Sequence, residues 1–271
     1  MEYSNQFVYF LSFVFGCMVG SFANVCIYRL PLSLNIVMPP SHCGKCNTPI
    51  SWFENIPILS FLFLRGRCRH CGISIGWIHP LVELVVGLLA VACVMHEGPS
   101  IYAAYFFVLL TSLLVISLID LEHRIIPDSI SIGGMILGVL LAILFQWAGK
   151  PWLVSAVDSM IGLVVGGAFL WGIAWGYEKL TGKEGMGFGD VKLVAFFGAH
   201  AGAQAALISI FVGSLLGSLI GFFLIIVQKK DRRTAIPFGP FLSIGFFLYV
   251  LHMLNIMHLP LHWIMGYAPN F

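Results

Sequence analysis

The stretch TGKEGMGFGDVKLVAFFG, from Thr181 to Gly198, sets glycines at alternate positions and then a single aspartate, Asp190, at the edge of an apolar run. The apolar run does not alternate polar and apolar residues as a barrel strand does, so it predicts a buried helix. A carboxylate beside hydrocarbon is costly and usually functional. The stretch therefore indicates a membrane protein that has a polar site at one end of a helix.

The rest of the chain has the composition of an integral membrane protein. Hydrophobic residues make up 59% of the 271 residues, charged residues make up 10%, and the mean hydropathy is +0.95. These values lie far outside the range of soluble globular domains. The apolar segments are about 17 to 24 residues long, which is the length that helices need to cross a bilayer. We expect an all-α fold with about eight transmembrane helices, over residues 7–28, 81–96, 101–120, 130–147, 157–177, 191–200 with its flanks, 205–227 and 237–256.

The basic residues predict the orientation of these helices. If the N-terminus lies outside, thirteen of the 14 Lys and Arg residues fall in cytoplasmic loops, and only Lys150 lies outside. This asymmetry is a strong positive-inside signal. It accounts for the basic residues, so we expect contact with the lipid bilayer and no nucleic-acid partner. The thirteen are Arg29, Lys45, Arg65, Arg67, Arg69, Arg124, Lys179, Lys183, Lys192, Lys229, Lys230, Arg232 and Arg233.

One long segment does not span the membrane and contains two cysteine pairs. These are CGKC (Cys43 and Cys46) and CRHC (Cys68 and Cys71), separated by the 21 residues 47–67. Two such pairs are typical of knuckles that deliver four thiolates to one structural zinc. The expected location is the reducing cytosol, where paired cysteines hold metal more often than they form disulfides. A redox dithiol pair and unliganded thiols are the alternatives.

The expected organisation follows from these segments. Residues 1–28 form the first transmembrane helix, residues 29–80 a cytosolic zinc-knuckle loop domain, and residues 81–271 a seven-helix transmembrane core. The loop domain is too small to have much apolar core, so we expect the metal to hold it together.

Two carboxylates are candidates for chemistry. Asp120 ends the third expected span, in SLIDLEHRIIPDSI, and Asp190 begins the sixth, so both are expected at the cytoplasmic boundary. Two neighbouring carboxyl groups share a proton, which provides an acid and a base that can activate water. The alternative is structural: each aspartate caps a helix or pairs with a nearby base, Arg124 or Lys192.

Other polar residues and glycines have separate expected roles. The glycines at 185, 187 and 189 favour a loop that admits an extended peptide beside Asp190. Asp128 precedes a long apolar helix and is expected to be its N-cap. Glu83 is an intramembrane carboxylate without a cation nearby in the sequence, which suits either a functional role, at a methylation site for instance, or a polar contact with another helix.

The chain resembles the type IV prepilin peptidases, which are bifunctional leader peptidases and N-methyltransferases of type IV pilus and type II secretion systems. The resemblance extends over nearly the whole chain. It rests on GSFANVCIYRLP (20–31), the two cysteine pairs, ENIPILS, HPLVELVVG, SLIDLEHRIIPD, TGKEGMGFGDVKL and PFGPFLSIG (237–245). The family's GxGD aspartyl-protease motif falls on Gly187, Phe188, Gly189 and Asp190. Its other catalytic aspartate falls on Asp120.

The resemblance implies an activity, substrates and a cofactor. The substrates are type IV prepilins or type II secretion pseudopilins with a short basic leader, which is cleaved after its terminal glycine, commonly before phenylalanine or methionine. The new N-terminus is then methylated with S-adenosylmethionine. The implied location is the bacterial inner membrane, with the active site near the cytoplasmic face.

The methyltransferase is implied by the resemblance alone, because the chain has no Rossmann-like glycine fingerprint. Glu83, Gly66 and Arg67 are candidates for a link to methyl transfer. At the last position the family often has lysine, and the arginine keeps the charge but changes the geometry. The alternatives are a peptidase without methyltransferase activity, an ion or proton transporter that uses paired carboxylates, and a zinc-organised scaffold without catalysis.

Overall fold

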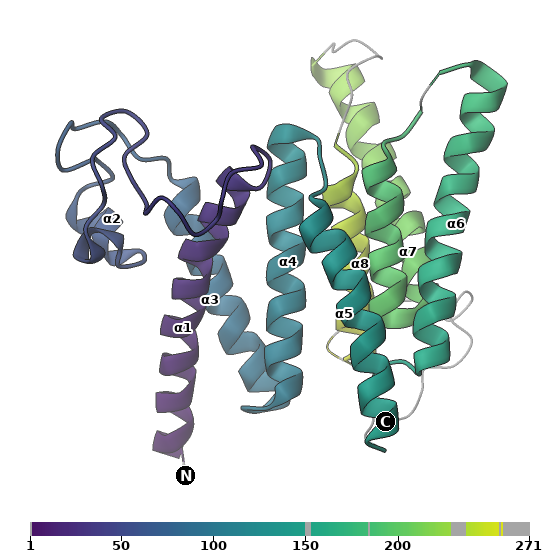
Figure 1. Ribbon diagram of the computed structural model, residues 1–271, viewed down its shortest axis with the longest axis horizontal. Coiled ribbons are helices and arrows are strands. Elements are labelled where there is room, and N and C mark those ends of the chain that lie inside the picture. Colours follow the sequence, from purple (N-terminus) through teal and green to yellow (C-terminus); the bar gives the residue numbers. More distant parts are fainter. Residues whose placement is uncertain (1, 150–152, 184, 229–236, 255, 257–271) are drawn as a thin grey trace. The chain divides into compact units, whose positions relative to one another are not determined.

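The computed structural model describes residues 2–149, 153–183, 185–228, 237–254 and 256, and in these residues all regular secondary structure is helical (Figure 1). Lys150 and the basic cluster at 229–233 lie outside the described residues. The elements are α1 (Glu2–Arg29), the 3₁₀ helix η1 (Trp52–Asn55), α2 (Leu59–Phe63), α3 (Ile78–Glu97), α4 (Ile101–His123), α5 (Asp128–Trp147), α6 (Ala156–Thr181), α7 (Phe188–Gln228) and α8 (Gly239–Met253).

Six of these helices are long and apolar enough to cross a membrane, namely α1, α3, α4, α5, α6 and α7. The α8 helix is apolar but has 15 residues. The expectation of an all-helical, multi-pass membrane protein is therefore confirmed. The expected spans 191–200 and 205–227 fall on the single element α7.

The chain divides into two compact units, Met1–Val115 and Ile116–Phe271. In the first unit α1 packs against α3, and the segment between them carries η1, α2 and the four cysteines. This segment has almost no core of its own, because between residues 31 and 79 only Ser60 and Gly66 are buried. Large apolar side chains such as Trp52, Phe63 and Trp77 are exposed on it.

In the second unit α5, α6, α7 and α8 pack side by side (Figure 1). The core lies around the first half of α7, where Leu193, Phe196 and Phe197 are fully buried. The ring of Phe197 stacks on Phe246 of α8, with 4.4 Å between the ring centroids. This packing holds the N-terminal turn of α7, which carries Asp190, in a fixed position.

The α7 helix reverses direction in its middle. Ala201 and Gly202 have non-helical backbone angles, and the φ of Gly202 is 80°. A Cβ atom on Gly162 of α6 would meet both Gly198 and Gly202, and one on Gly166, a turn later, would meet both Val194 and Ala206. In a straight helix residues 194 and 206 would be about 18 Å apart. The two halves of α7 therefore run antiparallel against α6.

Candidate functional site

Asp120 lies in the last turn of α4 and is 5% exposed. Its Oδ2 atom accepts a hydrogen bond of 2.9 Å from the backbone N–H of Gly239, the first residue of α8. A Cβ atom on Gly239 would lie 2.8 Å from the same Oδ2. The absence of a side chain at this position thus lets the start of α8 approach the carboxylate.

Asp190 is the third residue of α7 and is half-buried. Its carboxyl group is close enough to that of Asp120 for the two charges to interact. The turn that leads into the helix is closed by a hydrogen bond from the Asp190 N–H to the Gly187 carbonyl, at 3.2 Å. A Cβ atom on Gly189 would lie 3.3 Å from the Cβ of Ile126, so the glycine loop packs closely on the segment that follows α4.

An ion pair between Lys192 and Asp128 joins the same two segments. Asp128 is the first residue of α5, and the N-cap is Pro127, so the expectation that Asp128 is the N-cap is wrong. The carboxylate of Asp128 forms an ion pair with the Lys192 ammonium instead. In the described residues neither Asp120 nor Asp190 forms an ion pair. The alternative that Lys192 neutralises Asp190 is therefore not supported by the geometry.

These contacts bring four helix ends together at one end of the second unit. They are the end of α4 and the starts of α5, α7 and α8, linked through Asp120, Asp128, Lys192 and Gly239. Two carboxyl groups that lie close together in a poorly hydrated site share one proton, so one acts as an acid and the other as a base toward a water molecule. This arrangement is suited to hydrolysis of a peptide bond.

The four loop cysteines form a second candidate site. The Sγ atoms of Cys43, Cys46, Cys68 and Cys71 all lie within 4.8 Å of one another, and those of Cys43 and Cys71 are 3.7 Å apart. A tetrahedral zinc with four bonds of about 2.3 Å would place its sulfur ligands roughly 3.8 Å apart. The donor set and its dimensions therefore fit a zinc ion.

Both knuckles have the same backbone geometry, although they are separate in sequence. The N–H of Cys43 donates to the Thr48 carbonyl and that of Cys68 to the Ile73 carbonyl, so each cysteine bonds the residue five positions later. The residue four positions after each cysteine, Asn47 or Gly72, has a positive φ. Each knuckle is thus a preformed turn that directs its thiols to one side.

The pKa values of the cysteine thiols also favour the binding of a cation. Backbone N–H groups of Cys46 and Lys45 lower the pKa of the Cys43 thiol to about 6. The N–H of Ile73 acts in the same direction on Cys71, but desolvation and the neighbouring thiols outweigh it and raise the pKa of Cys71 to about 11. The first thiolate therefore forms readily and the last one needs a positive charge among the four sulfurs.

Glu83, Gly66 and Arg67 have contacts that shape the loop. The Oε2 atom of Glu83 accepts a 2.7 Å hydrogen bond from the N–H of Ile58, whose φ is positive, so it ties the start of α2 to α3. Gly66 has a φ of 64°, and a Cβ atom there would lie 2.9 Å from the Phe61 ring. Arg67 is exposed next to Cys68.

Sequence reasoning missed Gly239 and the pairing of Lys192 with Asp128. Both depend on contacts between residues far apart in the chain, at separations of 119 and 64 positions. A signal for the first was present: the last apolar segment begins with Pro-Phe-Gly-Pro, and a glycine allows its backbone to approach another group closely.

Comparisons with known proteins identify the family of the chain. Residues 14–97 match the bacterial peptidase A24 N-terminal domain, and residues 107–222 match the type IV leader peptidase family. The chain is similar to proteins named prepilin leader peptidase/N-methyltransferase from three bacteria. It is 37% identical to that of Pseudomonas putida and 39% identical to that of Aeromonas hydrophila, covering 89% of each chain in both cases. It is 35% identical to that of Pseudomonas aeruginosa, covering 87% of each chain.

No solved structure matches the chain. The curated relatives, however, are more than 30% identical and are covered over most of their length. The two family matches include both candidate aspartates and all four cysteines. The chain therefore belongs to the type IV leader peptidase family.

Proposed function

We propose that this chain is a membrane aspartyl endopeptidase that removes the short basic leader from type IV prepilins or pseudopilins and then methylates the new N-terminus. The proposal is supported by the position of Asp120 and Asp190 at the same end of the helical unit, where Gly189 of the glycine loop packs on Ile126, just after α4. Relatives over nearly the full length are prepilin leader peptidases and N-methyltransferases.

In the proposed reaction the ionised aspartate takes a proton from water, and the protonated one polarises the scissile carbonyl. The water oxygen bonds to the carbonyl carbon and the C–N bond breaks. One proton passes to the leaving amine, which becomes the new N-terminus of the substrate. The Gly187–Gly189 segment, with Phe188 64% exposed, is the proposed surface for the extended peptide.

Two cofactors belong to the proposal. Zinc, held by Cys43, Cys46, Cys68 and Cys71, has a structural role in the loop domain of residues 29–80. S-adenosylmethionine supplies the methyl group when bound. Glu83, Gly66 and Arg67 are the proposed candidates for a link to methyl transfer, and the contacts of Glu83 and Gly66 support a positioning role in the loop.

We further propose eight membrane segments with the N-terminus outside and the candidate site at the cytoplasmic face. The reversal at Ala201 and Gly202 supports a count of two segments for α7, and α8 supplies the last. Residues 1–28 then form the first segment and residues 81–271 the other seven. A transporter is not favoured, because the two carboxylates lie at helix ends and not at mid-helix.

The orientation can be tested by labelling introduced cysteines from either side of the membrane. Lys183→Cys, in the loop before α7, should react with a membrane-impermeant thiol reagent only from the cytosolic side, and Pro99→Cys, between α3 and α4, only from outside. The unchanged chain gives the background from its native cysteines. Labelling of Lys183→Cys from outside would invert the proposed topology.

Gly239→Ala is expected to lower the rate of cleavage by about 10²-fold, because a displacement of a catalytic group by about 1 Å can cost that much. The added methyl group would lie 2.8 Å from Oδ2 of Asp120 and must push the carboxyl group or the start of α8 aside. Gly133→Ala on α5 is the matched control, since no atom lies within 4 Å of a Cβ atom there. Cleavage by Gly239→Ala within twofold of the control would refute the assigned contact.

The proposed function as a whole is tested with purified protein, a prepilin and isotope-labelled S-adenosylmethionine. Intact-mass spectrometry should show loss of the leader and then gain of one methyl group on the shortened chain. Loss of the leader without the methyl group would reduce the proposal to a peptidase. A prepilin that stays full length would contradict the proposal.

A further inference from the structure

The short helix α2, in the loop between α1 and α3, exposes a group of large apolar side chains. Leu59, Leu62 and Phe63 on this helix are all exposed, and the exposed fraction of Phe63 reaches 83%. Trp77, the residue before α3, is also exposed, and its ring lies 4.7 Å from the Phe61 ring of α2, measured between centroids. We call Leu59, Leu62, Phe63 and Trp77 the α2 surface. Exposed apolar groups of this kind mark contacts with another protein or with a membrane.

Contacts within the first unit place α2 beside the part of α3 that can span a membrane. The N–H of Ile58, at the N-cap of α2, donates to Oε2 of Glu83. Glu83 lies inside the candidate span Ile78–Glu97, about 7.5 Å from its start at 1.5 Å per residue. A Cβ atom on Gly20 of α1 would lie 2.7 Å from the Cα of Glu83, so this level also lies well before the end of α1 at Arg29. Figure 1 accordingly shows α2 alongside α3 and below the upper end of α1.

The α2 surface is continuous with an exposed apolar face of α3. Leu81, Leu84 and Leu88 are exposed along that helix. Trp77 has helical backbone angles and stands four positions before Leu81, so its side chain lies on the same face. Because α3 is a candidate membrane span, this face contacts lipid wherever no other helix covers it. The α2 surface therefore extends a lipid-facing surface sideways from α3.

The residues around α2 suit the boundary between lipid headgroups and hydrocarbon. Residues 55–64 include no charged side chain. Arg65 and Arg67 follow directly and are exposed, and neither forms an ion pair in the part of the chain that the structure describes. Segments that lie in the membrane interface typically combine Trp, Phe and Leu on the buried side with basic residues that reach anionic headgroups.

We propose that the α2 surface is inserted into the bilayer leaflet next to the loop of residues 29–80, with Arg65 and Arg67 at anionic headgroups. The partner is lipid, because the surface lies at the level of the membrane spans and continues the exposed face of α3. This insertion gives a loop that buries almost no side chains a second attachment, in addition to its cysteine cluster.

Photo-crosslinking from p-benzoyl-phenylalanine at position 63 tests the contact. The full chain is placed in vesicles of phosphatidylethanolamine and phosphatidylglycerol, and mass spectrometry identifies the molecules that the probe has bound. Position 63 should give mainly lipid adducts. A second probe at position 59 should give the same result, so the test does not depend on a single site.

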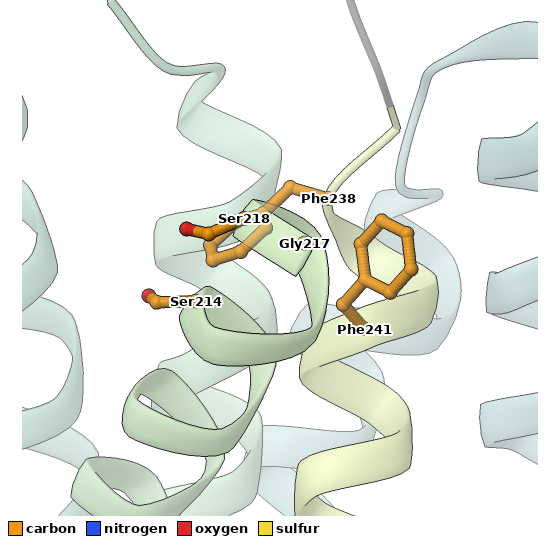
Figure 2. Close-up of a pocket in the computed structure, with 5 residues that line it drawn as sticks. All are labelled: Ser214, Gly217, Ser218, Phe238 and Phe241. Carbon is orange, nitrogen blue, oxygen red and sulfur yellow. The ribbon is translucent and has the colours of Figure 1, made fainter. Parts of the chain in front are cut away.

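Two phenylalanines in the second unit are reference positions for the probe. Phe222 is exposed on α7, a candidate membrane span, and should give lipid adducts. Phe241 lines a pocket of about 280 Å³ between α7 and α8, next to Gly217 (Figure 2). A probe at position 241 should therefore give adducts with α7 peptides. The adducts at position 63 should resemble those at position 222 and not those at position 241.

The headgroup contact is tested with Arg65→Gln. This variant should lower the ratio of phosphatidylglycerol to phosphatidylethanolamine adducts at position 63 by up to about fivefold, which is the usual contribution of one basic residue near an anionic surface. Arg69→Gln is the matched control, because Arg69 already pairs with Glu54 at 3.6 Å, and it should change the ratio less. An equal ratio in the unchanged chain and both variants would refute the headgroup contact.

Two results at position 63 would overturn the inference. Adducts with peptides of a second copy or of another part of the chain would assign the α2 surface to a protein contact. Absence of adducts at positions 63 and 59, while position 222 still gives lipid adducts, would place the surface in water. No prepilin is present in these measurements, so their outcome is independent of the proposed function.

Discussion

Replacement of Cys43 and Cys71 together by serine should reduce the zinc content from about one ion per chain to near zero and unfold the loop of residues 29–80. Four thiolates complete a closed tetrahedral site, and two do not. Between residues 31 and 79 only Ser60 and Gly66 are buried. The loop therefore buries too little apolar surface to keep its fold without the metal. In small zinc domains the ion contributes roughly 10–16 kcal/mol of apparent binding free energy, which is then folding free energy.

Elemental analysis gives the zinc content, and hydrogen exchange measures whether the loop is folded. The amides of Cys43 and Cys68, which are hydrogen-bonded in the two knuckles, should exchange slowly in the unchanged chain and rapidly in the double variant. Cys26→Ser is the control, because Cys26 lies in α1 outside the cluster. Full zinc retention in the double variant would show that the four cysteines do not form the site.

Local sequence patterns predicted the helices well, for a physical reason. A backbone in hydrocarbon must satisfy its own hydrogen bonds, so length and apolar composition nearly determine where helices lie. The break between the expected spans 191–200 and 205–227 corresponds to the reversal at Ala201 and Gly202, where Gly202 has a positive φ. The cysteine cluster was predictable because two CxxC pairs are typical of zinc knuckles, and both pairs form the same turn in the structure.

The contacts inside the candidate site could not be predicted in the same way. The sequence indicated that Asp120 and Asp190 share a depth, but the Gly239 N–H that binds Asp120 comes from a segment 119 positions away. Asp128 had the local features of an N-cap, and its ion pair with Lys192 depends on the packing of α5 against α7. Such contacts arise from how helices pack, which short-range periodicity does not contain.

Asp120→Asn and Asp190→Asn should each lower the rate of leader cleavage by at least about 10²–10⁴-fold, which is the usual contribution of a general acid or base. Asparagine keeps the size of the side chain, and its carbonyl oxygen can still accept the N–H of Gly239. The contacts that hold α8 against α4 should therefore survive in Asp120→Asn. Asp158→Asn, at the start of α6, is the matched control for exchange of a carboxylate for an amide.

Methyl transfer makes a different demand on the protein. It needs a donor site and a deprotonated amine, with no requirement for a pair of carboxyl groups. A substrate that already lacks its leader should thus be methylated by both variants at a substantial fraction of the unchanged rate. Loss of both activities in a folded, zinc-loaded variant would show that the two reactions share essential residues.

The most direct test of the central claim is the intact mass of a prepilin after incubation with each aspartate variant, measured beside the unchanged chain and Asp158→Asn. The pairing of Asp120 with Asp190 predicts that the leader remains attached with either site variant and is removed by the other two proteins. Removal of the leader by Asp120→Asn or Asp190→Asn at the unchanged rate would contradict the assignment of that aspartate, and with it the two-carboxylate mechanism.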